Sequence, residues 1–96
     1  MSHTSVSNLL KTLKNAETRV RVGKRYYHYK SPEKEYRVIR VALMENNEKP
    51  AVIYTDGTLT WIRDLDVWCE KVDHNGELVD RFTECECVHR SCGCKH

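Results

Sequence analysis

The hydrophobic positions of the chain follow two different periods, and the change between them falls near residue 19. Val6, Leu9, Leu10 and Leu13 recur at helical spacing, so they share one face of a helix. We therefore expect a short helix over residues 5–16. A helix of this length is marginal by itself in water. Its apolar stripe must either cover a sheet or join a partner subunit.

Beyond residue 19, apolar and polar residues alternate, as they do in half-buried strands. Ser31-Pro32 predicts a turn over residues 31–34, while Asp56-Gly57 and Asn75-Gly76 are signals for tight hairpins. The expected strands cover residues 20–30 (with a break at Gly23), 35–44, 51–55, 58–63, 68–73 and 78–82, and a single helical turn covers residues 64–67.

This pattern predicts a mainly β fold: a small antiparallel barrel of five or six strands with a short N-terminal helix and a Cys-rich C-terminal tail. Closing the sheet would remove exposed edges that so short a chain can hardly cover otherwise. We assign residues 1–18 to the helix, residues 19–83 to the barrel and residues 84–96 to the tail.

Charge changes this picture only locally. The 16 basic and 14 acidic residues give a net charge of +2, too balanced to indicate nucleic-acid binding by itself. Basic residues concentrate in residues 11–40 and acidic residues in residues 64–86, which leaves room for a basic patch. There is no apolar run of membrane-spanning length and no secretory signal, so we expect a soluble, cytoplasmic protein.

Candidate chemistry begins in residues 23–30, which hold three tyrosines, one histidine and three cations. On a strand, Tyr27 and Tyr29 share one face and could join a core, while the other face presents its side chains to solvent. The expected ligand-binding residues, taken from that second face and from later strands, are Tyr26, His28, Lys30, Tyr54, Trp61 and Arg63. Their rings can stack on flat ligands and their cations can bind phosphate or carboxylate. The alternative is that the tyrosines and Trp61 form the barrel core.

The tail contains Cys85, Cys87, Cys92 and Cys94, two Cys-x-Cys pairs that could complete a tetrahedral, structural Zn²⁺ site. His89 or His96 could substitute as ligands. Disulfides, or a tail without either, remain open. We expect Cys69 to be a small buried hydrophobe.

The block from Gly23 to Val72 resembles a bacterial and phage domain-of-unknown-function family, number sixteen-fifty-three. The residues that carry the resemblance are Gly23, Tyr26, His28, Tyr29, Lys30, Tyr36, Val38, Val52, Ile53, Tyr54, Trp61, Ile62, Arg63, Trp68, Glu70, Lys71 and Val72. The chain departs from the family pattern at residues 43–46, and at Asp64, where the family usually has Pro. The resemblance implies an SH3-like barrel but no reaction.

No nucleophile triad, phosphate-binding loop or metal-hydrolase motif is present, so we do not expect an enzyme. The leading interpretation is a binding module for a nucleotide-like or other anionic ligand. In a phage it would act in the host cytoplasm, sequestering a signalling molecule or blocking a defence. The alternatives are an RNA- or DNA-binding barrel, and a protein–protein adaptor or inhibitor that pairs or dimerises through its N-terminal helix.

Overall fold

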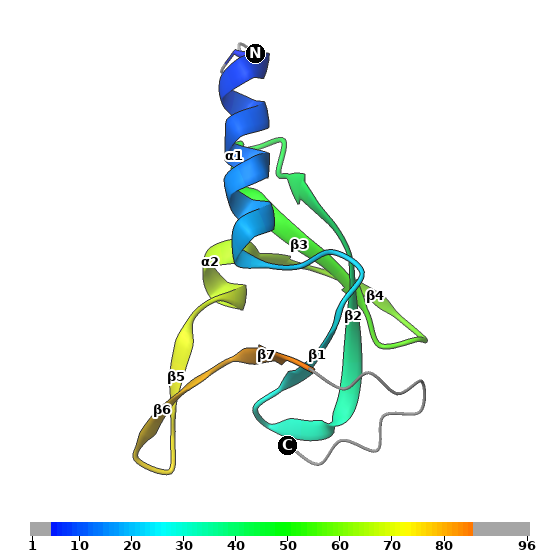
Figure 1. The fold of residues 1–96 in the computed structure, drawn as a ribbon, viewed down its shortest axis with the longest axis vertical. Helices are drawn as coiled ribbons and strands as arrows, with labels where there is room; N and C mark the ends of the chain where they lie inside the picture. Colours follow the sequence, from blue (N-terminus) through cyan, green and yellow to red (C-terminus); the bar gives the residue numbers. More distant parts are fainter. Residues whose placement is uncertain (1–4, 86–96) are drawn as a thin grey trace.

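A computed structural model describes residues 5–85, which form two helices and seven strands (Figure 1). The elements are α1 (Val6–Arg19), β1 (Arg25–His28), β2 (Ser31–Leu43), β3 (Pro50–Thr55), β4 (Thr60–Asp64), α2 (Leu65–Trp68), β5 (Lys71–His74), β6 (Glu77–Asp80) and β7 (Phe82–Glu84). Five strands form an antiparallel sheet in the order β4-β3-β2-β1-β7. The hairpin of β5 and β6 is a separate two-stranded sheet.

The mainly β, antiparallel fold with an N-terminal helix is confirmed, but the expected closure into a barrel is wrong. In the described chain, β4 and β7 lie at opposite edges of the sheet and do not pair with each other. Between them the chain passes through α2 and the separate β5–β6 hairpin, and it returns as a strand of only three residues. That strand pairs with β1, so the sheet stays open.

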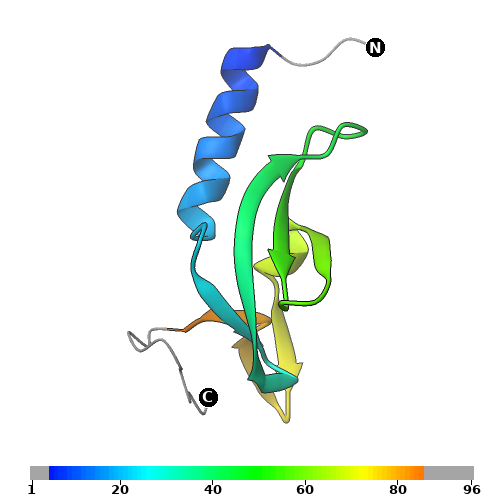
Figure 2. The same ribbon diagram turned by 90° about the vertical axis from the view of Figure 1, so that its right-hand side faces the viewer.

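The long strand β2 connects the two halves of the sheet, and it bends along its length (Figure 2). A bulge interrupts its pairing with β3 between Val38 and Arg40. Bulges bend a strand and increase its local twist. The upper part of β2 therefore runs beside α1, while its lower part pairs with β1.

Helix α1 extends three residues beyond the expected end, to Arg19. It begins at Ser5, whose side chain accepts a hydrogen bond from the Asn8 N–H, and it ends at Val20, which has an extended backbone. In the described part of the chain, neither helix is long and apolar enough to cross a membrane.

Residues 20–24 are not a strand, contrary to expectation. Gly23 adopts φ +84°, a conformation that favours glycine. Its N–H donates to the Val38 carbonyl at 2.8 Å, and the Val38 N–H donates to the Lys24 carbonyl at 3.0 Å. The segment between α1 and β1 is therefore a turn held against the β2 bulge.

The predicted turn at residues 31–34 is also wrong, because β2 already begins at Ser31. The chain reverses one step earlier, where His28 Nδ1 accepts a hydrogen bond from the Lys30 N–H at 3.1 Å. Asn75 and Gly76 both have positive φ and form the tight β5–β6 turn, as predicted.

Two further element boundaries differ from the expected ones, one because of core packing and one because of backbone hydrogen bonds. Trp68 closes α2 rather than opening a strand, because Leu65 and Trp68, three residues apart, both point into the core. The expected strand at residues 78–82 is split at Arg81. The Arg81 N–H donates to the Glu70 carbonyl, and its carbonyl accepts from the Tyr29 N–H.

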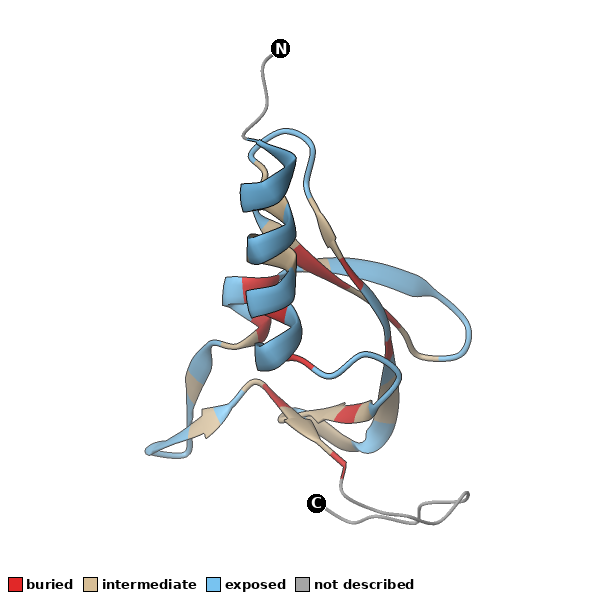
Figure 3. Cartoon of the chain, turned by 45° about the horizontal axis from the view of Figure 1, so that its top comes forward, coloured by how far each residue is buried: buried red, intermediate tan, exposed pale blue. Residues whose placement is uncertain are grey.

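The core lies on the sheet face that α1 and α2 cover (Figure 3). Its aliphatic part includes Ala16 of α1, Val20, Leu65, and Val38, Val41 and Val52 of the sheet. Its aromatic part is centred on Trp68 and Phe82, whose rings are stacked at 3.8 Å with an interplanar angle of 3°. Tyr54 meets both rings edge-on, at 5.0 and 5.7 Å.

We expect Phe82→Ala to lower the free energy of unfolding by about 3–5 kcal/mol, the usual effect of removing a buried aromatic ring. Leu78→Ala is the control, because Leu78 is 73% exposed and should change the stability by less than about 0.5 kcal/mol. Urea denaturation followed by tryptophan fluorescence measures both. Equal effects of the two substitutions would contradict the central role of Phe82.

Candidate functional site

Two of the six expected ligand-binding residues are buried. Tyr26 is 6% exposed and Tyr54 is 5% exposed, so the expectation that they present their rings to solvent is wrong. Tyr26 pairs with Tyr36 and Glu84 in the middle of the sheet. Its hydroxyl accepts from the Arg21 N–H at 2.9 Å and donates to Glu84 at 3.5 Å. Burial is the main cause of its raised pKa.

His28 and Arg63 both contact one ring, that of Phe82. The His28 ring meets Phe82 edge-on at 5.0 Å, and the Arg63 guanidinium lies 5.4 Å from the same ring centre. Arg63 Nε also donates to the Tyr54 hydroxyl at 3.4 Å. Two buried aromatic residues, Phe82 and Tyr54, thus hold the Arg63 guanidinium in place.

Two arginines near His28, Arg63 and Arg81, are only partly paired within the described residues. Arg63 has no carboxylate partner in residues 5–85. Arg81 is bonded to Glu70 at 2.6 Å, yet its Nε is buried with no hydrogen-bond partner among the described residues. Burial, and then the positive charges of Arg63, Arg81 and Lys30, lower the pKa of His28.

The lowered pKa favours a neutral His28 near pH 7. Because Nδ1 accepts the hydrogen bond from the Lys30 N–H, the ring proton of the neutral form is on Nε2. His28 can therefore donate one hydrogen bond through Nε2 without carrying a charge.

Trp61 and Lys30 lie at the margins of this region. Trp61 is 45% exposed and pairs with Tyr54 across β3 and β4, which places it on the same face as Arg63. Lys30 is exposed in the β1–β2 turn, with Nζ 5.8 Å from the Tyr29 ring centre. We call His28, Lys30, Trp61 and Arg63 together the cationic surface.

The cationic surface has donors and a ring but no evident nucleophile. Guanidinium and imidazole N–H groups bind phosphate or carboxylate oxygens, and an exposed indole can stack on a flat ring. Its geometry is therefore suited to holding an anion that carries a ring.

Sequence reasoning missed Phe82, which contacts both His28 and Arg63, and Arg81, whose charge acts on His28. Phe82 is the one phenylalanine of the chain, a signal that it fills a particular core position. Its role depends on the pairing of β7 with β1, in which Phe82 lies opposite His28. That pairing joins distant segments and leaves no local pattern.

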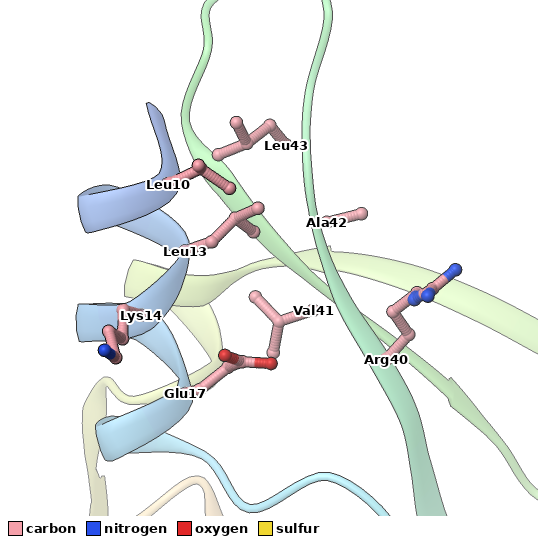
Figure 4. Close-up of a pocket in the computed structure, with 8 residues that line it drawn as sticks. All are labelled: Leu10, Leu13, Lys14, Glu17, Arg40, Val41, Ala42 and Leu43. Atoms are coloured by element: carbon pink, nitrogen blue, oxygen red, sulfur yellow. The ribbon is translucent and has the colours of Figure 1, made fainter. Parts of the chain in front are cut away.

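A separate groove of about 660 Å³ lies between α1 and β2. Figure 4 shows Leu10 and Leu13 pointing from α1 towards Leu43 and Val41 of β2, while Arg40 points away. Lys14 and Glu17 also line the groove. It does not include any residue of the cationic surface.

The expected zinc ligands cannot be placed together. Cys85 is buried at the end of β7, and Cys87, Cys92 and Cys94 lie outside the described residues. Within residues 5–85 there is no cluster of three or more histidine, cysteine or acidic side chains suited to a metal ion. The four-cysteine site remains a prediction. Cys69 is only partly buried, packs against the core, and has a pKa raised by burial.

Comparison with known proteins gives one match. The sequence model of a family described as "Protein of unknown function (DUF1653)" matches residues 24–84. This confirms the resemblance inferred from the motifs between Gly23 and Val72. Searches of curated proteins and of solved structures gave no significant match.

We expect His28 to titrate below its ordinary value of 6.5, and Arg63→Met to raise its pKa by removing the largest of the neighbouring charge effects. Because the folded pKa lies below the unfolded one, the contribution of His28 to stability is complete above about pH 6.5 and falls as the pH decreases. Proton NMR of the imidazole measures the pKa directly. Arg40→Met, on the opposite face of the sheet, is the control and should leave it unchanged.

Proposed function

We propose that this chain, which belongs to the family of unknown function DUF1653, is a non-enzymatic binding module for a nucleotide-like or other anionic ligand. The observation that carries the proposal is the half-buried Arg63, whose guanidinium has no carboxylate partner in residues 5–85. A guanidinium that is held on an aromatic ring without a carboxylate keeps its charge available for a partner, and an anionic ligand would supply the missing negative charge.

Capture would need no covalent step. The anion accepts N–H groups of Arg63 and the Nε2–H of His28, and a flat ring of the ligand stacks on Trp61. Stacking of a base on an aromatic side chain contributes about 1–3 kcal/mol. Phe82 and Tyr54 hold the guanidinium before the ligand arrives, so little side-chain freedom is lost on binding.

The surroundings of His28 make this binding sensitive to pH. An anion between His28 and Arg63 offsets the positive charges that lower the His28 pKa. The imidazole then gains a proton more readily, so affinity should increase as the pH falls from about 8 to 6.

A binding module of this kind suits a phage protein that acts in the host cytoplasm. By holding a signalling nucleotide, it would lower the free concentration of that molecule and so block a defence that depends on it. This biological role rests on the chemistry of the cationic surface together with the phage occurrence that the family resemblance implies.

We expect isothermal titration with a panel of cyclic and ADP-ribose-type nucleotides to give binding that Trp61→Ala and Arg63→Met each weaken about tenfold or more. Tenfold corresponds to about 1.4 kcal/mol, within the range for a lost stacking or charge-assisted contact. Arg37→Met is the matched control, because Arg37 is an exposed arginine on the opposite face. Absence of heat across the panel, or equal loss with Arg37→Met, would overturn the proposal.

The same titrations separate a small ligand from a nucleic acid. If the surface held RNA or DNA, oligonucleotide affinity would fall steeply with salt, because phosphate contacts release counterions. A nearly flat salt response together with nucleotide binding supports the small ligand.

The second candidate function is a protein–protein adaptor or inhibitor. The exposed apolar side chains of α1 favour it. Val6 is 71% exposed and Leu10 is 60% exposed, and Leu10 borders the groove between α1 and β2 (Figure 4). An amphipathic helix of a partner would fit such a groove.

We also propose that the tail binds one structural Zn²⁺ through Cys85, Cys87, Cys92 and Cys94, since four thiolates complete its preferred tetrahedron. Native mass spectrometry of protein purified without chelator should show one zinc per chain. Cys94→Ser should remove or weaken the metal, whereas Cys69→Ser, in α2's C-cap, should not. A metal-free chain, or disulfides in the tail, would refute the site.

A further inference from the structure

The outer edge of β4 is open and carries two exposed apolar side chains. In the described chain β4 pairs with β3 on one side and with nothing on the other. Trp61 is 45% and Ile62 is 63% exposed. Natural edge strands are usually protected by short length, charged side chains, proline, a bulge or a covering segment. β4 is short and carries Arg63 and Asp64, but it contains no proline and pairs with β3 in regular register. Such an edge is a template for another strand.

The hairpin register determines which backbone groups of β4 are available. The Asp56 N–H donates to the Leu59 carbonyl, so this pair is hydrogen-bonded. Antiparallel pairs alternate between hydrogen-bonded and non-hydrogen-bonded, and Ile53 with Ile62 is therefore a non-hydrogen-bonded pair. The N–H and C=O of Thr60 and Ile62 consequently point outwards, away from β3.

The strand is complementary to itself when reversed. If two copies of β4 meet antiparallel about an axis through Ile62, Ile62 faces its equivalent, and the outward N–H and C=O groups face each other. Thr60 then lies opposite Asp64, where its hydroxyl can donate to the carboxylate. Trp61 lies opposite Arg63, a cation–π arrangement. Every side-chain pair is of a favourable kind.

We propose that two copies of this chain pair through β4 and form one continuous antiparallel sheet across a two-fold axis. The contact is isologous, so it closes on itself and does not propagate into a fibre. The pairing does not depend on the proposed ligand. It would, however, place the indole of each copy beside the Arg63 of the other, so that both chains would contribute to each cationic surface.

Sedimentation velocity over micromolar to millimolar concentrations tests the pairing. Wild-type protein should show a monomer–dimer equilibrium, and Ile62→Pro should abolish it. Proline removes the outward N–H but leaves the β3–β4 ladder intact, because that N–H is not bonded to β3. Ile62→Val keeps the N–H and the branched side chain and should still dimerise.

Two charge variants keep the test decisive if Ile62→Pro fails to fold. Thr60→Asp faces Asp64 of the second copy and should raise the dimer dissociation constant about fivefold, while Thr60→Lys should lower it at low salt. Circular dichroism checks that both variants are folded. A strictly monomeric wild type, or a dimer that neither Thr60 variant affects, would overturn the proposal. The latter result would direct attention to the α1 groove.

Discussion

The stacking of Trp68 on Phe82 is the contact on which the rest of the structure depends. It joins the short helix after β4 to the short strand that returns beside β1. Neither element has enough residues to be stable alone. Around this stack, Tyr26, Tyr36 and Tyr54 pack edge-on. The open sheet thus gains an aromatic core in place of barrel closure.

The same stack explains why the cationic surface exists. Phe82 stacks on Trp68 within the core and also contacts His28 and Arg63. A guanidinium that rests on an aromatic ring is partly desolvated, so it interacts more strongly with an arriving anion than a free surface arginine would. If the proposed function is correct, Phe82 serves both the stability of the fold and the binding of the ligand.

Local patterns in the sequence predicted the elements well where one signal dominated. The apolar stripe of α1, the Asn75-Gly76 turn and the strand at residues 51–55 all appear with small changes of boundary. Tertiary contacts decided the rest. Residues 20–24 alternate like a strand but bond to the β2 bulge, and Trp68 ends a helix because two core positions three residues apart need filling.

In the candidate site, too, local sequence patterns predicted one part and tertiary contacts decided the rest. Alternation along residues 24–30 correctly grouped Tyr26 with His28, but it could not tell which face was inward. That depends on β7, which pairs with β1 from far along the chain. Tyr26 therefore became core, whereas His28, at the end of the strand, stayed half-exposed. The partners that lower the pKa of His28 come from β4, from the segment before β7, and from the adjacent turn.

The late position of β7 has a consequence for synthesis on the ribosome. β1 and β2 are adjacent in the sequence and can pair as soon as both have emerged, but the other edge of β1 has no partner until residues 82–84 emerge. Until then the rings of Tyr54 and Trp68 lack the contact with Phe82 that they make in the folded chain. The aromatic core can therefore be completed only when β7 pairs with β1. A stalled or truncated chain without β7 would expose apolar surface and an unpaired strand edge, and both favour aggregation.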